Sequence, residues 1–488
     1  MRLYLGCDLG TSGLKLTLLN EKGEIVRDLT KNYPLLLPLP GYSEQDPLEW
    51  VKALKEGILE ILTPQEKPCL RSIAIDGQMH GLVILDEQGK VLRPAILWND
   101  GRSVKEVDYL NNEIGQDVLL KRTCNIAFAG FTLPKLLWVK NNEPELYGKI
   151  RMVLLPKDYL DYVLTGAFAT EPSDACGTLY YDVANGAWSK EMIAISGLSE
   201  SCFPKLVASN AVVGTILPEL AKELGLPNCV KVLAGAGDNA GAALGIGALQ
   251  SGECNISIGT SGTIFAPADK PFAHPLGAIH GFNAANGKYC ALACMLSAAS
   301  SLLWLQENIF HSKDFVSEQN AIKPESLGKN QVFFLPYLSG ERSPWNDSLA
   351  RGAFVGLNLA TQREDLVQAV LEGVGFALKD SLVELEKAGI KIKQSYLTGG
   401  GCKSRLWQRI LASILNIDLL ISDSAEKGPS FGMALMAATE DGAFASLEEA
   451  KQVAMHIKET IRPDEALVKL YEERYQEFRR YYPAIKNR

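Results

Sequence analysis

The sequence has no long hydrophobic run. Across its 488 residues, no segment reaches the about 20 uninterrupted apolar residues that a membrane-spanning helix needs. The apolar run at the start of the chain is interrupted at Asp8. That is too early for the hydrophobic region of a secretory signal peptide, and it suits a buried strand. We therefore expect no membrane partner and a cytoplasmic protein.

Paired cysteines and an excess of positive charge are also missing. The ten cysteines include no C-x-x-C pair, which argues against a zinc site and against the disulfide framework of a small secreted domain. We expect them to be small buried side chains in a reducing compartment. The formal net charge of −8 argues against a nucleic-acid partner, since phosphate backbones are bound by basic surfaces. It does not exclude a phosphorylated small ligand, because such a ligand is bound at one site by backbone N–H groups, lysine and metal.

Two common nucleotide-binding motifs are absent as well. No G-x-x-x-x-G-K-[ST] sequence occurs, which excludes a P-loop enzyme. The glycine-rich run Gly235–Gly247 lacks the G-x-G-x-x-G spacing of a dinucleotide-binding fold. A nucleotide would therefore need loops of another kind.

The first hundred residues are rich in predicted strands. Apolar or alternating segments predict strands at 3–8, 14–19, 24–33 and 70–76. Before the last of these, the pair Asp46-Pro47 predicts the start of a helix, with aspartate as the N-cap and proline at the first helical position. Three strands, a helix and then further strands is an order found in ribonuclease-H-like domains.

The second half starts in the same way. Cys254–Ile258 predicts a short strand, Gly259–Gly262 a turn, and 263–266 the strand that leaves it. The turn sequences DLGTSG at 8–13 and SIGTSG at 257–262 have the same form. We therefore expect two related domains.

We place the two domains at residues 1–245 and 246–488, since single cores stop growing beyond about 250–300 residues. Helical spacing of apolar residues predicts a long helix over 364–387. A charged helix is predicted over 461–482, and it could pack on either domain.

The turn after the first strand suits a phosphate chain. Gly10 allows the backbone to approach a ligand closely, and Thr11 and Ser12 add hydroxyl donors. Lys15 is the last residue of the segment. Asp8 stands at the mouth of the turn, where a carboxylate can hold Mg²⁺ directly or through water. Taken alone, the segment could equally be a plain hairpin. A second turn of the same form favours two phosphate loops that clamp a nucleotide between the domains.

The second turn, with Gly259, Thr260 and Ser261, would supply the other phosphate loop. A third glycine-rich segment, Gly399–Gly401, follows a predicted strand and precedes a helix that begins near Ser404. Three glycines there let the backbone lie flat against a ligand such as adenosine. A flexible strand-to-helix loop is the alternative.

A single carboxylate, Asp238, lies in a run of very small residues from 235 to 241. Phosphoryl transfer to a sugar needs a group that orients the hydroxyl and accepts its proton, as an aspartate does in protein kinases. Alternatively, Asp238 caps the helix predicted over 239–249, and both roles are compatible.

His80 follows the strand at 70–76. Ligands gather at strand ends in open α/β sheets, so His80 is a candidate ligand contact. A purely structural role for His80 is the alternative.

Two long patterns and several short ones are shared with one enzyme family. The long patterns are GFTLPKLLWVKNN (Gly130–Asn142) and GAFVGLNLATQREDLVQAVLE (Gly352–Glu372). The short ones are SEQDP (Ser43–Pro47), GQMHG (Gly77–Gly81), LPKDYL (Leu155–Leu160), GDNA (Gly237–Ala240) and LPYLSGERSP (Leu335–Pro344). On these residues the chain resembles the FGGY family of carbohydrate kinases over essentially its full length, and most closely those that act on D-xylulose.

The resemblance implies an α/β fold of two ribonuclease-H-like (actin/hexokinase-like) domains flanking a deep ligand cleft. It implies that Asp238 is the general base and that Asp8 helps to hold Mg²⁺. The sugar contacts expected from it are Met79, His80, Asp238 and Asn239. With the two turns, the expected ATP contacts are Gly10, Thr11, Ser12, Lys15, Gly259, Thr260, Ser261, Gly400, Gly401 and Ser404.

We therefore expect ATP-dependent phosphorylation of a ketopentose, above all D-xylulose to D-xylulose 5-phosphate, with ATP and Mg²⁺ as cofactors. One alternative is another sugar or polyol, such as ribulose, glycerol or gluconate. Another is an actin- or Hsp70-like ATPase, whose nucleotide loops would look alike. The pairs Asp238-Asn239 and Met79-His80 favour a small polyol substrate. The sequence is compatible with a homodimer.

Overall fold

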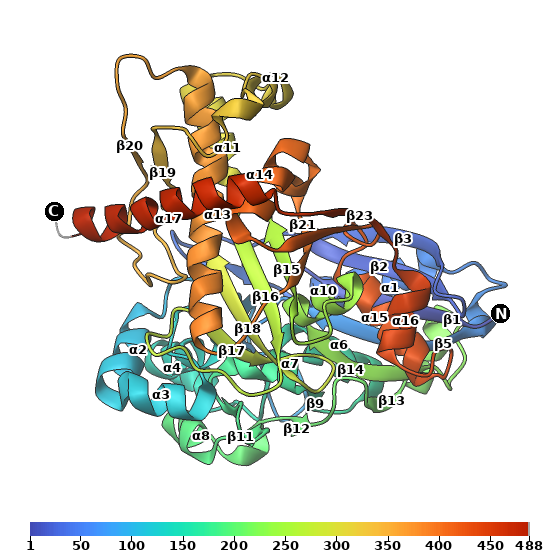
Figure 1. The fold of residues 1–488 in the computed structure, drawn as a ribbon. Helices are drawn as coiled ribbons and strands as arrows, with labels where there is room; N and C mark the ends of the chain where they lie inside the picture. The colour runs from blue at the N-terminus through green and yellow to red at the C-terminus, as the bar shows by residue number, and fades with distance from the viewer. Residues whose placement is uncertain (487–488) are drawn as a thin grey trace.

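Two mixed β-sheets organise the chain, and the computed structural model describes residues 1–486 (Figure 1). The first sheet consists of β1 (Leu3–Leu9), β2 (Gly13–Asn20), β3 (Ile25–Asn32), β5 (Leu70–Gly77), β13 (Val212–Thr215) and β14 (Lys231–Gly237). The second consists of β15 (Glu253–Ile258), β16 (Gly262–Ala268), β17 (His280–Asn283), β18 (Tyr289–Met295), β21 (Gln394–Thr398), β22 (Asp418–Ser422) and β23 (Ile457–Ile461).

The two sheets repeat one strand order. The first runs β13-β14-β5-β1-β2-β3, and the second runs β23-β22-β21-β15-β16-β18 with β17 added at its edge. In both, the first strand pairs in parallel with a later strand (β1 with β5, β15 with β21) and antiparallel with the next one (β2, β16). The predicted repetition of one α/β unit, and with it the fold class, is therefore confirmed.

Helices connect and cover the strands. The long ones are α1 (Pro47–Ile61), α4 (Thr132–Asn142), α6 (Pro156–Thr165), α10 (Asp238–Ile246), α13 (Arg363–Lys387), α14 (Arg405–Leu415), α15 (Pro429–Glu440) and α17 (Glu465–Ile485). Shorter ones are α2 (Val104–Asp108), α3 (Gln116–Thr123), α7 (Pro172–Ala175), α8 (Lys190–Ser196), α9 (Pro218–Leu224), α11 (Ala299–Trp304), α12 (Phe315–Asn320) and α16 (Leu447–Ala454). Short strand pairs include β4 (Glu44–Gln45) with β7 (Ala95–Ile96) and β6 (Val83–Leu85) with β8 (Met152–Leu154).

Local sequence signals determine where α1 begins and which of its faces is buried. The Asp46 side chain accepts a hydrogen bond from the backbone N–H of Leu48 at 2.9 Å, and proline occupies the first turn, where it needs no N–H partner. The apolar stripe then buries Trp50, Leu54 and Ile58 completely or nearly so, against β2 and β3. The helix begins where the sequence predicts.

Helices α10 and α15 cross at very short range. A Cβ atom at Gly432 of α15 would lie only 2.4 Å from the carbonyl oxygen of Gly241 in α10. α15 also packs on the first sheet, where the hydroxyls of Ser430 and Thr17 are 2.8 Å apart. A helix from the C-terminal part of the chain therefore covers the sheet formed by the N-terminal part, and it ties the two halves together.

The segment predicted as one helix over 461–482 divides into two elements. Residues up to Ile461 form strand β23, and the helix begins only at Glu465, capped by the Asp464 side chain. Pro463 explains the break, because a proline disfavours helical backbone at the residue before it. Helix α17 packs against α13 and α14, and the Tyr475 hydroxyl donates to Asp380 at 2.7 Å. The last helix thus belongs to the second half.

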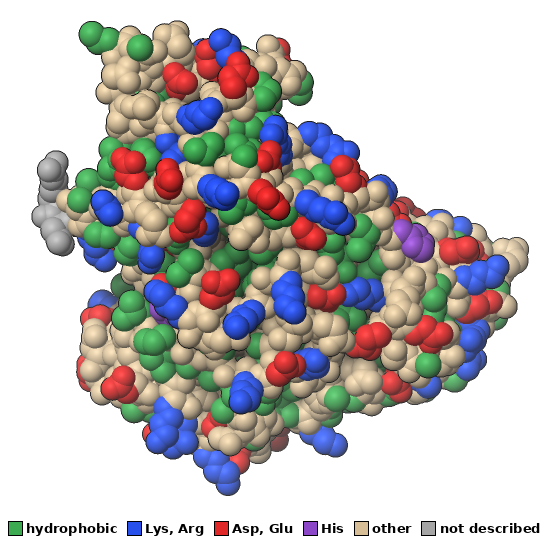
Figure 2. Space-filling view, in the orientation of Figure 1, with side chains coloured by type: hydrophobic (Ala, Val, Ile, Leu, Met, Phe, Trp, Pro, Cys, Tyr) green, Lys and Arg blue, Asp and Glu red, His purple; other side chains and the backbone are tan. Residues whose placement is uncertain are grey.

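Charge is spread evenly over the face seen in Figure 2, where lysine and arginine alternate with aspartate and glutamate. Among residues 1–486, no helix is both long and apolar enough to cross a membrane.

We predict that Gly432→Ala destabilises the protein although alanine is the better helix former. The new methyl group would be forced against the α10 backbone, and such overpacking typically costs about 1–3 kcal/mol. The measurement is thermal unfolding by calorimetry. Gly148→Ala is the matched control, because the nearest neighbour of a Cβ atom there would be the carbonyl oxygen of Pro144 at 3.5 Å. Equal stability of the two variants would contradict the close crossing.

Candidate active site

Three carboxylates meet at one edge of the first sheet. β14, β5 and β1 are neighbours, and each ends at or next to an aspartate. Asp8 on β1 is the register partner of Asp76 on β5, and Gly237, the last residue of β14, is the partner of Gly77. Asp238 follows as the first residue of α10. The parallel arrangement of the three strands is what brings these distant residues to one place.

Asp76 is the most enclosed of the three. Its side chain is fully buried, and no N–H or hydroxyl group among the described residues donates to either carboxylate oxygen. Burial first, and then the charge of Asp8, raise the pKa of Asp76 well above its usual range. Burial also raises the pKa of Asp8, although the Lys15 ammonium opposes the effect. Such a group of carboxylates is stable only with a proton or a cation.

Asp238 is held by its neighbour Asn239. Its Oδ1 accepts from the Asn239 backbone N–H at 2.7 Å and from the Asn239 side-chain amide at 2.8 Å. Burial and the charge of Asp8 nevertheless raise the pKa of Asp238 to about 7. A carboxyl with that pKa can exchange a proton near neutral pH, as a general base must.

The alternative role of Asp238 as helix cap is not what the structure shows. Gly237 occupies the cap position, and Asp238 is the first helical residue. The helix is also shorter than predicted, because Gly247 takes a left-handed backbone conformation (φ 86°) and ends it at Ile246.

Met79 and His80 follow β5 closely, and Met79 lies beside Gly237 and Asn239. The Asn239 amide is 3.9 Å from the Met79 sulfur. His80 Nδ1 lies 2.9 Å from the carbonyl oxygen of Gly177, and because a carbonyl only accepts, Nδ1 carries the proton. Burial lowers the pKa of His80 to about 3. The ring is therefore neutral, and its Nε2 is an acceptor suited to a hydroxyl group.

The first glycine turn joins β1 to β2. The Gly10 N–H donates to Gly13 O at 3.1 Å, which closes the turn. Ser12 is exposed at its tip. Lys15 reaches across to the second half of the chain and donates to the carbonyl oxygen of Lys427 at 2.8 Å, just before α15. The lysine thus stands between the turn and the C-terminal part of the site.

Thr11 is fixed by side chains from three segments. Its hydroxyl donates to the Gln78 side chain at 3.1 Å and accepts from the Trp98 indole N–H at 3.0 Å. Its carbonyl accepts from the Gln45 amide at 2.6 Å. The Thr11 hydroxyl is therefore occupied, and a phosphate at this turn would be bound by backbone N–H groups and Ser12.

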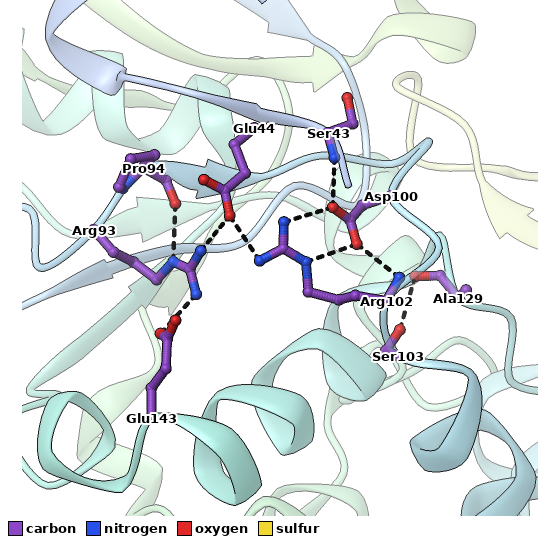
Figure 3. Close-up of polar contacts among 9 residues, drawn as sticks. All are labelled: Ser43, Glu44, Arg93, Pro94, Asp100, Arg102, Ser103, Ala129 and Glu143. Atoms are coloured by element: carbon purple, nitrogen blue, oxygen red, sulfur yellow. Dashed lines mark hydrogen bonds and ion pairs between the residues drawn. The ribbon is translucent and has the colours of Figure 1, made fainter. Parts of the chain in front are cut away.

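A buried ion-pair network holds the segments that carry Gln45 and Trp98 (Figure 3). Arg102 makes two hydrogen bonds to Asp100, at 2.9 and 2.7 Å, and an ion pair with Glu44 at 2.6 Å. Asp100 also accepts from the backbone N–H of Ser43 at 2.6 Å, and Glu44 pairs with Arg93. Since Arg102 and Asp100 are almost completely buried, the two segments are held rigidly against the first turn.

The second glycine turn and the third glycine segment share one cavity of about 550 Å³. The carbonyl of Thr260 accepts from the Ser300 hydroxyl at 2.7 Å, which sets the turn against the start of α11. Ser404 caps α14 by accepting from the Trp407 N–H at 3.2 Å. The predicted residues on the wall are Thr260, Gly400, Gly401 and Ser404, and apolar ones include Leu303, Phe315, Val316 and Trp407. Its size and apolar lining suit the base and ribose of a nucleotide.

A smaller cavity of about 240 Å³ is lined by residues of both halves. Its wall includes Asn239 from the first half, Asn255 and Ser257 from β15, and Gly399 beside the larger cavity. A chain of phosphates leading from the larger cavity toward Asp238 would pass here.

Several residues of this site were missed by the sequence reasoning. Asp76 carried the same signal as Asp8, an aspartate and a glycine at the end of a buried strand, and could have been found. Asn255, Thr263 and Gly428 carried no local signal, because only tertiary contact brings them to the smaller cavity.

Comparison with known proteins gives one consistent result. The model of the N-terminal domain of the FGGY family of carbohydrate kinases matches residues 3–245, and that of the C-terminal domain matches residues 254–440. The xylulose kinase of Escherichia coli (strain K12) is 39% identical over 484 residues, which cover 99% of each chain.

Solved structures agree. A crystal structure of a "xyloylose kinase" from Brucella ovis is 38% identical, with a TM-score of 0.91 and 100% of both chains covered. The ligand-bound xylulose kinase from Lactobacillus acidophilus is 26% identical, with a TM-score of 0.93 over 100% of this chain and 99% of that one.

We predict that Arg102→Met lowers the free energy of unfolding by about 3–5 kcal/mol, because it leaves buried carboxylates without their partner. Chemical denaturation followed by circular dichroism measures the change. The control is Lys190→Met, which removes an exposed ion pair of 3.8 Å to Glu200 and should change stability by no more than about 0.5 kcal/mol. A similarly small change for Arg102→Met would show that the network is not structurally important.

Proposed function

This chain belongs to the FGGY family of carbohydrate kinases, and we propose that it transfers the γ-phosphate of ATP to D-xylulose, giving D-xylulose 5-phosphate. The observation that carries the proposal is Asp238, a carboxyl with a pKa of about 7, whose partner Asn239 contacts Met79 and lines a cavity shared with the second half. The identity to curated xylulose kinases over the full chain supports the choice of sugar.

The sugar subsite in this proposal consists of Met79, His80, Asp238 and Asn239. A ketopentose offers hydroxyl groups that can donate to His80 Nε2 and to Asp238. The Asn239 amide can donate to a sugar oxygen as well as to Asp238. We assign this subsite and the first phosphate turn to a domain of residues 1–245.

The ATP subsite spans both halves. The triphosphate lies between the turns Gly10–Ser12 and Gly259–Ser261, with Lys15 as the positive charge beside it. Adenosine occupies the cavity of about 550 Å³, against Gly400, Gly401 and Ser404. We assign the second turn and this cavity to a domain of residues 246–488.

Mg²⁺ fits the donors present. Among residues 1–486, no three His, Cys, Asp or Glu side chains are arranged as a complete metal site. This agrees with an ion that takes one or two carboxylates and completes its shell with water and phosphate oxygens. Asp8 would hold it, directly or through water, and Asp76, the neighbour of Asp8 on β5, accepts no N–H or hydroxyl hydrogen bond from the described part of the chain. When bound, the ion neutralises charge on the transferred phosphate.

The transfer follows from these positions. A sugar hydroxyl donates to Oδ2 of Asp238, because Oδ1 is already occupied by Asn239. The hydroxyl oxygen attacks the γ-phosphorus in line while its proton passes to Asp238. The bond from the γ-phosphorus to the bridging oxygen breaks, and ADP leaves with that oxygen. Most of the catalysis is positioning and the stabilisation of charge.

The test is ADP release by the purified protein with Mg²⁺ and a panel of D-xylulose, D-ribulose, glycerol and gluconate. We expect D-xylulose to give the highest kcat/KM. Asp238→Asn should reduce kcat by about 10²–10⁴-fold, the usual contribution of a general base, while ATP still binds. Preference for another sugar would overturn the choice of substrate, and ATP turnover that ignores all sugars would overturn the kinase proposal.

The activity should also depend on pH in one direction. Only the deprotonated Asp238 can accept a proton, and its pKa is raised to about 7. The value of kcat/KM for the sugar should therefore rise as the pH increases through about 7. Steady-state rates at saturating ATP measure the profile. A profile that stays flat from about pH 6 to about pH 8 would contradict Asp238 as the base.

A further inference from the structure

A buried polar cluster lies behind the proposed general base and has no role in the mechanism above. It consists of Lys157 in α6, Glu171 before α7, Ser173 in α7 and Ser209. Lys157, Glu171 and Ser173 are at most 1% exposed. Burying a lysine and a glutamate together is costly unless both are fully partnered. The contacts around them therefore indicate what the cluster does.

Glu171 acts as an acceptor on both oxygens. Oε2 accepts from the Ser173 N–H at 2.8 Å and from the Ser209 hydroxyl at 2.6 Å. Oε1 accepts from the Asp174 N–H at 2.8 Å and from the Ser173 hydroxyl at 2.9 Å. The Lys157 ammonium is 3.9 Å from Oε1. All four hydrogen bonds are therefore donated to Glu171, and both of its oxygens act as acceptors.

Glu171 fixes the direction of the Ser173 hydroxyl. A carboxylate can only accept, so the hydroxyl hydrogen of Ser173 must point at Oε1. The oxygen of Ser173 is then available as an acceptor, and the backbone N–H of Gly237 donates to it at 3.1 Å. A hydrogen-bonded chain thus runs from Glu171 through Ser173 to the peptide group that joins Ala236 and Gly237, one residue before Asp238.

Gly237 is also enclosed on its other side. A Cβ atom there would lie 2.9 Å from Met79 Cγ and 3.2 Å from the carbonyl oxygen of Ser173. The backbone at this point is therefore held between α7 and the methionine of the proposed sugar subsite. A small movement of Gly237 would move the Asp238 carboxylate with it.

We propose that Ser173 is a positioning residue for Asp238, which it places through the Gly237 N–H while Glu171 fixes its own orientation. The inference rests on the proposed function, because it assigns a role relative to the general base. Ser173 itself does not contact the substrate. Its loss should displace the carboxylate from the in-line arrangement and leave the nucleotide cavity unchanged.

The experiment compares Ser173→Ala with Ser209→Ala. Each variant removes one buried hydroxyl that donates to Glu171, but only Ser173 also accepts from Gly237. Steady-state kinetics with ATP and the sugar preferred in the panel give kcat and both KM values. Calorimetric titration with ADP measures the fraction of the protein that is folded and binds nucleotide. Thermal unfolding of both variants records the structural cost.

Ser173→Ala should lower kcat by about 10- to 100-fold with an unchanged KM for ATP, because small misplacements of a reacting group cost that much. Ser209→Ala should keep kcat within about 2-fold of the wild type at a comparable loss of thermal stability, since Glu171 retains its contact with Ser173. If Ser173→Ala does not fold, Ser173→Cys takes its place with the same expectation.

Two results would overturn the proposal. One is a wild-type kcat in Ser173→Ala, and the other is an equal loss of kcat in both variants, which would indicate a general structural effect. The variant Asp238→Asn distinguishes a failure of the Ser173 proposal from a failure of the proposed function. Wild-type activity in Asp238→Asn would remove the general base itself, whereas an inactive Asp238→Asn with a fully active Ser173→Ala would overturn only the role of Ser173.

Discussion

The crowding of three carboxylates at the ends of adjacent strands is the constraint on which the rest of the site depends. Burial raises the pKa values of Asp8, Asp76 and Asp238, and the charge of Asp8 raises those of Asp76 and Asp238 further. Such a group is unfavourable until positive charge joins it. In the proposed transfer to a sugar hydroxyl, that charge would come as a proton for Asp238 and as a cation that accompanies the phosphates.

The scaffold around the carboxylates is rigid where the chemistry needs it. The ion pairs of Arg102 hold the segments that contact the first turn, and Glu171, through Ser173, holds the N–H of Gly237. Both networks are buried, so solvent competes little with their hydrogen bonds. Close contact between α10 and α15 then links this half to the cavity formed by the second half. The arrangement allows groups from both halves to face one phosphate chain.

Much of the fold was predictable because its signals are local. The cap of α1 at Asp46, the length of α13, the two glycine turns and the start of α14 at Ser404 all follow from residues within a few positions of one another. The predictions that failed depended on other information. Strand β23 at Ile457–Ile461 forms because β22 offers it an edge, and the sequence alone favoured a helix from 461. Asp238 is not a helix cap because Gly237 takes that position.

The sequence by itself determined the family, the repeated α/β unit and the residues at the strand ends, since glycine turns, strand periodicity and caps are encoded by neighbours along the chain. Only the tertiary structure decided that Asp76 joins Asp8 and Asp238, that Ser173 meets Gly237, and that α15 covers the sheet of the other half. Those contacts join residues far apart in the chain. Their energies come from burial and desolvation, which depend on what surrounds a group in space and not on its neighbours in sequence.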